Sequence, residues 1–588
     1  MPVQSDPRPG RRSHFAAALL ALAVSTAVAG CGSSHAGASA TDPAAAIPAS
    51  APLYAGAIVR PSGPERTAAS AAGRALSHQA DPYLRLLAAL QTPGSAPLDF
   101  NRDVAPWLGA DAGIFLSSLD ASEQSKIGTL LSGLARELLG GASAGGAFPF
   151  SAHGVQGAIV LDTSDAGKAR SFLESQAKRA GAVTAGYRGV AYLLSPEGTA
   201  FAVVHGLAVI GSVDGLHGVI DTTLGGPSLA RSTAYAKLVA LAPAGTLAHV
   251  YVNPGASTRA AASQSSAGLL GLLAGTRETN ISFVPSATSI ALDFDTLASP
   301  TADPASAPAS GGLLGSSSEG AQAAGELPSE SWLAAGLGNV GASLGNDVAG
   351  LRSLVSVAGS LGGSGSEAQA SAGLNLNGVL EAILKPLSAL GANSAEARRD
   401  FSSWMGSAGI FASGTSLVDL KAGIVIASRN PSLSRAAVGE LGGLLAKSGA
   451  SVAPVTIAGA QAAVSVELTG LPVTLDVVDA RAADGQTKFV IGLSEASVTA
   501  ALNPSSTLSS SAPYSAASTA LGEGIRPSLS LDVPTFLGLL EGLGLSEEPS
   551  ISKLVPYLRS LTTVSGGGRS LGEGAQRLRV VAGLAHSE

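Results

Sequence analysis

The sequence predicts an α+β protein made of two homologous modules in tandem, each a mostly antiparallel sheet with packed helices. Strand-like runs come in groups joined by short turns, which favours antiparallel sheets over a doubly wound sheet. Phrases of the first half recur in the same order in the second half. Apolar residues make up 46% of the 588 residues, enough for several cores. We place the first module at 47–296, a linker at 297–326 and the second module at 327–588.

The N-terminal segment has the composition of a secretory leader. Three arginines precede an apolar run, Phe15–Ala29, that is shorter than the about 20 residues a membrane-spanning helix needs. The run ends in Val-Ala-Gly followed by Cys31, the only cysteine in the chain. A lone cysteine at the cleavage position resembles a bacterial lipobox, in which the thiol is acylated. We therefore expect a lipoprotein signal peptide at 1–30, lipidation of Cys31 and a flexible Ala/Ser/Gly tether at 31–46.

The composition of the chain limits how the protein can attach to a membrane and which classes of partner it can bind. With Cys31 committed to lipid, no cysteine remains for a disulfide, so stability must come from burial. No later segment reaches about 18 uninterrupted apolar residues, which leaves the acyl chains as the expected attachment to the extracytoplasmic face of the membrane. A net charge of -7 offers no source for phosphate neutralisation, so a nucleic-acid partner is not expected.

The periodicity of each run assigns the elements of the first module. Ser164 and Asp165 are candidate helix caps and Gly181 is a stop. The expected strands are Leu53–Val59, Ala112–Leu116, Val155–Leu161, Val190–Leu194, Ala200–Val204, Leu207–Gly211, Thr246–Val252 and Thr288–Phe294, and the expected helices are Pro82–Leu90, Ser122–Leu139 and Ser164–Ala180. A last strand, Arg577–Leu584, would occupy the place of Thr288–Phe294 in the second module.

Self-similarity supports the duplication, because a repeat missed at this stage misassigns the whole fold. IPASAPLYAGAIV from Ile47 returns as LPSESWLAAGLGNV from Leu327, and the strand and helix from Gly157 match those from Ala422. HVYVNP from His249 corresponds to SLSLDVP from Ser528. Several anchors in one order are hard to produce by composition alone.

Two short segments match the sequence of a catalytic or cofactor-binding motif but lack the structural context that the motif requires. Gly336 to Gly341 reads GLGNVG, the spelling of a dinucleotide fingerprint, but a chain with 74 glycines produces this about once by chance. The first module lacks the glycines at the matching place, so we expect no cofactor. Ser143 lies in GASAG, the spelling of a nucleophile elbow, but it follows a predicted helix instead of a strand. We expect a flexible loop there and no catalytic residue.

Histidines and tryptophans are the remaining candidates. The eight histidines are scattered without zinc-motif spacing, so no metal site is expected. His205 and His249 fall in apolar strands, where a hydrogen-bonded histidine is more common than a ligand or base. Trp107 and Trp404 hold equivalent places in the repeat, each four residues after an aspartate, Asp103 or Asp400. The simplest interpretation is a large packing anchor with a capping aspartate, and the alternative is the lining of an apolar pocket.

The lipobox, IPASAPLYAGAIV, DVAPWLG followed by AGIF, and LPSESWLAAGLGNVG together resemble actinobacterial lipoproteins grouped under domain of unknown function 3352. The resemblance covers the mature chain and implies a secreted, lipid-anchored protein without assigned catalytic residues. We expect a non-enzymatic protein that binds or scaffolds at the cell envelope, with an envelope protein or an apolar ligand as possible partner. Two alternatives stay open: a carrier of an apolar envelope molecule, which needs a continuous cavity, and an envelope hydrolase.

Overall fold

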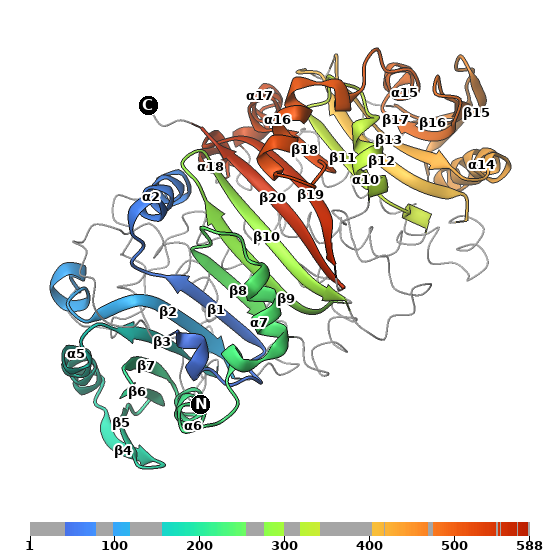
Figure 1. Cartoon of the computed structure of the whole chain (residues 1–588). Coiled ribbons are helices and arrows are strands. Elements are labelled where there is room, and N and C mark those ends of the chain that lie inside the picture. Colours follow the sequence, from blue (N-terminus) through green and yellow to red (C-terminus); the bar gives the residue numbers. More distant parts are fainter. Residues whose placement is uncertain are drawn as a thin grey trace, which may run out of the picture. The chain divides into compact units, whose positions relative to one another are not determined.

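A computed structural model describes residues 42–77, 98–117, 156–253, 276–298, 318–341, 403–467 except 417 and 448, 474–547, and 551–585 except 553 and 573. Outside this part lie Cys31, Ser143, Asp400, the predicted helices Pro82–Leu90 and Ser122–Leu139, and His14, His35, His78, His153 and His586. By contacts the chain forms two units, one of Met1–Ala236 with Leu247–Asn253 and one of Lys237–Thr246 with Pro254–Glu588. The elements are drawn in Figure 1.

Unit 1 contains an antiparallel sheet with the strand order β4-β5-β6-β7-β3-β2-β1-β8. Helices α5 and α6 pack on β6 and β7. The strands are β1 Leu53–Ile58, β2 Leu108–Leu116, β3 Gly157–Thr163, β4 Val183–Tyr187, β5 Val190–Leu194, β6 Thr199–Val204, β7 Leu207–Ser212 and β8 Ala248–Val252. The helices are η1 Pro43–Ala46, α2 Gly63–Ser77, η2 Phe100–Val104, α5 Ala166–Arg179, α6 Val213–Thr223, η3 Leu229–Arg231 and α7 Thr233–Leu241, whose last residues count with unit 2.

Local signals in the sequence account for these helix boundaries. The Asp165 carboxylate accepts hydrogen bonds from the amides of Gly167 and Lys168 at 3.1 and 3.0 Å, which caps α5 as expected. Gly181, with φ of 69°, ends that helix. Ser212 caps α6 by accepting from the Gly215 amide, so β7 passes directly into this helix.

Unit 2 contains an antiparallel sheet with the order β14-β15-β16-β17-β13-β12-β11-β18-β19-β20-β10-β9. The strands are β9 Thr276–Pro285, β10 Ser289–Ala298, β11 Leu333–Leu337, β12 Met405–Ser413, β13 Lys421–Ser428, β14 Ser451–Pro454, β15 Ala460–Glu467, β16 Thr474–Arg481, β17 Thr487–Gly492, β18 Leu529–Asp532, β19 Leu561–Gly572 and β20 Ala575–Leu584. The helices are α10 Ser318–Gly325, α14 Pro431–Lys447, α15 Glu495–Leu502, η4 Leu508–Ser510, α16 Ala512–Leu521, α17 Val533–Gly542, η5 Leu545–Glu547 and α18 Val555–Arg559.

The strand order of unit 1 recurs in unit 2, where β14 to β17, β13, β12, β11 and β18 follow one another as β4 to β7, β3, β2, β1 and β8 do. Every strand pairing among the described residues is antiparallel, and helices lie between groups of strands, so the fold is α+β as expected. The module boundaries stay a prediction. The hairpin β9–β10, which the repeat assigns to the first module, belongs by contacts to unit 2.

Three local features differ from the sequence analysis or were not anticipated by it. The predicted linker contains helix α10 at Ser318–Gly325, which packs through Gly320, Ala321 and Ala324 and lacks the bulky apolar residues that periodicity detects. Strand β4 was not expected, because its residues are mostly exposed and include a glycine. His205 lies in the exposed turn between β6 and β7 with φ of 46°, and not in an apolar strand.

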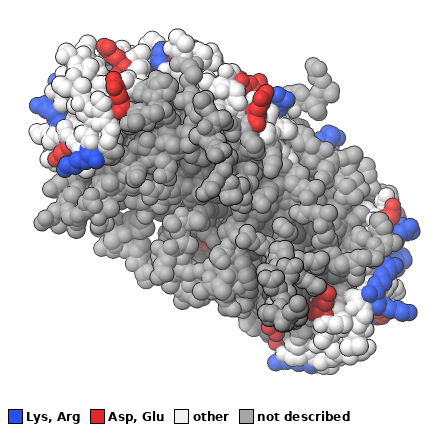
Figure 2. Space-filling view, turned by 180° about the vertical axis from the view of Figure 1, so that it is seen from behind, with Lys and Arg blue, Asp and Glu red and all other residues white. Residues whose placement is uncertain are grey.

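None of the helices in the described part of the chain is long and apolar enough to cross a membrane. Figure 2 shows acidic and basic side chains interspersed over the described residues of one face.

Candidate functional site

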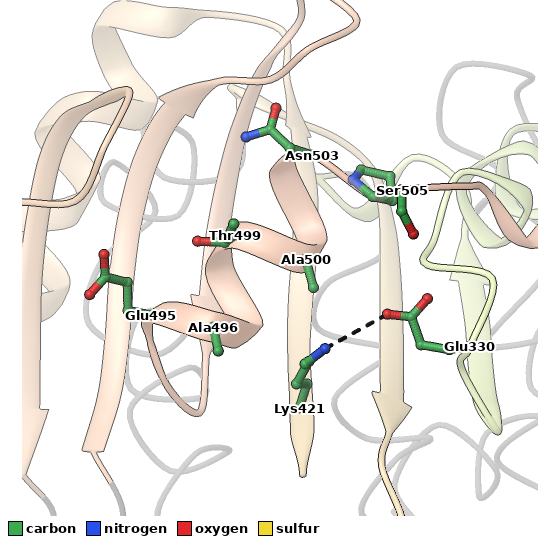
Figure 3. A pocket seen from close by; sticks show the side chains of 9 residues that line it. Glu330, Lys421, Glu495, Ala496, Thr499, Ala500, Asn503 and Ser505 are labelled. Carbon is green, nitrogen blue, oxygen red and sulfur yellow. Dashed lines mark ion pairs between the residues drawn. The ribbon is translucent and has the colours of Figure 1, made fainter. Parts of the chain in front are cut away.

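A groove of about 560 Å³ in unit 2 is the candidate functional site. Its lining comes from three segments that are far apart in the sequence. They are the loop before β11, the first residue of β13, and helix α15 with the loop after it, contributing Glu330, Lys421, Glu495, Ala496, Thr499, Ala500, Asn503, Pro504 and Ser505. Figure 3 shows these side chains from close by.

Helix α15 forms one wall because its two faces differ. Val498, Ala501 and Leu502 are buried, and the helix packs on β13, β16 and β17. Ser494 accepts a hydrogen bond from the Ser497 amide at the start of the helix. The opposite face leaves Thr499 exposed toward the groove, one helical turn after Glu495.

The opposite wall is held by contacts between the loop before β11 and the loop after α15. The Ser329 amide donates to the carbonyl oxygen of Ser506 at 3.0 Å, and the hydroxyls of the same two residues lie 2.6 Å apart. Pro328 and Thr507 form an isolated β-bridge beside them. These contacts fix the backbone just before Glu330.

One loose ion pair crosses the groove. The Lys421 Nζ lies 3.9 Å from the Glu330 Oε1, and the two side chains are 39% and 45% exposed (Figure 3). Pairs that are this exposed contribute little to stability, so both charges can exchange their partner for a ligand at small cost. With Glu495, Asn503 and the hydroxyl of Thr499, the groove offers an ammonium, two carboxylates, an amide and a hydroxyl for polar recognition.

Unit 1 holds a cluster of buried aromatic and ionisable side chains. Tyr54 is buried, with its ring edge-on to Tyr235 and His249 at centroid distances of 6.0 and 5.6 Å. The Tyr235 hydroxyl lies 3.1 Å from the His249 Nε2. Burial lowers the pKa of His249 to about 4 and raises the pKa of Tyr235. His249 is therefore a hydrogen-bonded, neutral histidine at neutral pH, as the apolar strand around it predicts.

A second buried polar contact of unit 1 lies at a bulge in β2. The Asp162 carboxylate accepts a hydrogen bond from the Ala110 amide at 3.2 Å, where β2 has extra residues opposite β3. Gly109 makes room, since a Cβ there would overlap that carboxylate. Burial, with the charges of Asp162 and Asp42, raises the pKa of Asp111 to about 6.

The tryptophans are packing anchors. Trp107 and Trp404 are each 1% exposed, which confirms that both are packing anchors, whereas the expected cap Asp400 lies outside the described residues. The Trp107 indole N–H donates to the carbonyl oxygen of Asp103 at 2.8 Å, while the Asp103 carboxylate accepts from the Asp99 amide at 2.9 Å. The carboxylate of Asp103 thus stabilises the turn, and its backbone carbonyl oxygen accepts the hydrogen bond of the indole.

The glycine-rich phrase from Gly336 has a structural explanation. A Cβ on Gly336 would overlap the carbonyl oxygen of Gly320, so this glycine lets helix α10 lie against β11. Asn339 accepts a hydrogen bond from the Arg429 guanidinium at 2.9 Å. Among the described residues no group of three or more His, Cys, Asp or Glu side chains is placed to hold a metal ion.

Sequence reasoning did not find the groove. Its polar residues are isolated in their own segments and form no motif, and the approach of Glu330 to Lys421 depends on strand order. The sequence signal nearest to it is the cap residue Ser494, followed by a helix with one polar face.

The comparisons with known proteins identify a family. The family model described as protein of unknown function (DUF3352) matches residues 15–566. No curated protein matches. A solved structure titled "Structure of crystal form I of TP0453" is similar with a TM-score of 0.24 and 8% identity, over 45% of this chain and 81% of that one. Since the family model covers most of its length, the chain belongs to the DUF3352 family.

Proposed function

We propose that this member of the DUF3352 family is a lipid-anchored extracytoplasmic protein that binds a polar molecule at the cell envelope. The anchoring part is supported by the leader and by Cys31 as the only cysteine. The binding part is supported by the groove of unit 2, whose polar lining is the reason for proposing a polar ligand. No reaction is part of this proposal.

The lining of the groove favours a polar ligand over an apolar one. Apolar molecules are held in cavities with mostly apolar walls and few polar groups. Here the charged and hydrogen-bonding side chains of Glu330, Lys421 and Asn503 line one opening. The polar head of an envelope molecule, or the surface of an envelope protein, suits this lining better than an acyl chain does.

Lipidation is tested by labelling cells with radioactive palmitate. The native protein should incorporate label and sediment with membranes, while Cys31→Ala should do neither. Ser34→Ala, a conservative change just past the lipobox, is the matched control and should behave like the native protein. A Cys31→Ala protein that remains equally membrane-associated contradicts the anchoring.

Ligand binding is tested by mass spectrometry of the lipids and metabolites that co-purify with the mature protein. A polar species should be enriched with the native protein and lost from the double variant Lys421→Ala/Glu330→Ala. Lys168→Ala removes a lysine from an exposed ion pair of unit 1, 3.1 Å from Asp165, and should retain the species. Equal recovery from all three proteins rules out the groove as the site.

The same samples address the two alternatives. An apolar molecule that is retained by the groove variant would favour the carrier. Covalent labelling of the native protein by a serine-directed probe, lost in Ser143→Ala, would favour the hydrolase.

A further inference from the structure

The strands β10 and β20 pair in the sheet although they are nearly 300 positions apart in the chain. Two buried ion pairs join them, with both aspartates on β10 and both arginines on β20. Asp293 lies opposite Arg579 and Asp295 opposite Arg577 in the antiparallel register. The aspartates are two residues apart on one strand and the arginines two residues apart on the other. All four side chains therefore lie on the same face of the sheet.

Both pairs are bidentate. The Arg577 Nε and Nη2 lie 2.7 and 2.8 Å from the two Asp295 carboxylate oxygens, and the Arg579 Nε and Nη2 each lie 2.6 Å from an oxygen of Asp293. The aspartate side chains are 0% exposed, and those of Arg577 and Arg579 are 6% and 19% exposed. A planar guanidinium matches a carboxylate in this geometry, whereas a lysine does not.

The remaining donors of both arginines are directed at helix ends. Arg577 Nη2 donates to the carbonyl oxygen of Leu241, the last residue of α7, and Arg579 Nη1 donates to that of Leu521, the last residue of α16, at 3.1 Å. Carboxyl ends of helices attract cations. The positive charges on β20 thus satisfy both carboxylates and two helix termini.

We propose that these charges make strand pairing selective. The basic strand β20 accepts an acidic strand that has carboxylates on alternate residues. This acidic strand is β10 of the same chain. Pairing β10 with another β10 would bring buried carboxylates face to face, and β20 with β20 would do the same for guanidinium groups. The opposite charges therefore direct β10 and β20 to one another and keep two copies of either strand from joining. This inference is independent of the groove and of its ligand.

Charge reversal in the full chain tests this selectivity. One variant, all basic, carries Asp293→Arg and Asp295→Arg, and the other, all acidic, carries Arg577→Asp and Arg579→Asp. Each alone has like charges at the interface and should melt well below the native protein. Co-expressed, the two variants should exchange strands and form a complex with one copy of each, seen as doubled mass by light scattering and as both masses in native mass spectrometry.

The quadruple variant, with all four changes in one chain, distinguishes the loss of charge complementarity from a general failure to fold. It restores opposite charges within the chain, and should recover most of the native melting temperature and the native mass. Reversing an exposed pair of the same unit, Glu541→Arg with Arg559→Glu, 2.9 Å apart, should change neither quantity. The proposal is overturned if the quadruple variant is as unstable as the two doubles, or if the co-expressed doubles form no mixed complex.

Discussion

Arg577 and Asp295 face one another across β20 and β10 in a bidentate pair with distances of 2.7 and 2.8 Å. Burial alone would lower the pKa of Arg577, but the hydrogen bond to Asp295 and the charges of Asp295 and Asp293 outweigh it, so the pKa is raised. The guanidinium is therefore charged at any pH at which the protein is folded. Removing either partner leaves a buried charge without its counterpart.

Arg577→Met is expected to lower the free energy of unfolding of unit 2 by about 3–5 kcal/mol, because Asp295 then stays buried and unpaired. Urea unfolding followed by circular dichroism measures this. Adding Asp295→Leu should restore part of the loss, since two apolar groups replace the pair. Arg102→Ala, which breaks an exposed pair with Asp103, should leave stability almost unchanged, and an equal loss there would contradict the explanation from burial.

His249 should make unit 1 less stable in acid. Its pKa in the folded protein is about 4, below the ordinary value near 6.5, so the unfolded chain takes up a proton first as the pH falls. The stabilising contribution is complete above about pH 6.5 and is lost progressively toward pH 4. His249→Gln should flatten the melting temperature of unit 1 over that range, and an unchanged slope would show that another group is responsible.

Asp111 should have the opposite dependence. Its pKa of about 6 lies above the ordinary value, so protonation favours the folded state and stability decreases as the pH rises from about 4 to 6. Asp111→Asn removes the buried charge and should raise the melting temperature at pH 8 but not at pH 4. Asp165→Asn, which keeps a capping side chain outside the bulge, is the control and should not reproduce this pattern.

Gly336→Ala is expected to destabilise unit 2 by several kcal/mol, because the new Cβ must push α10 away from β11. Gly439→Ala is a matched change in the middle of α14, where a Cβ meets nothing within 4 Å. There the substitution should stabilise by up to about 1 kcal/mol through helix propensity. Chemical denaturation of both variants measures the contrast, and equal effects would mean that Gly336 is not required for close packing.

The sequence by itself determined the local structure wherever one segment carried its own signal. The short apolar run Val190–Leu194 predicted β5 with the bounds that the structure has, and the cap and stop at Asp165 and Gly181 placed the ends of α5 within two residues. The equivalent places of Trp107 and Trp404 in the repeat predicted two packing anchors, and the burial of both side chains confirms it. The leader and Cys31 likewise depend on one short stretch.

Only the tertiary structure decided which distant segments meet. Helix α10 was hidden because Gly320 and Ala324 contact the sheet by small size rather than by hydrophobicity. The groove forms because Glu330 lies beside Lys421, and the buried ion pairs form because β10 lies beside β20. No local sequence pattern specifies either approach. Periodicity reports which face of a segment is buried, whereas partners are chosen by strand order and charge complementarity across the assembled sheet.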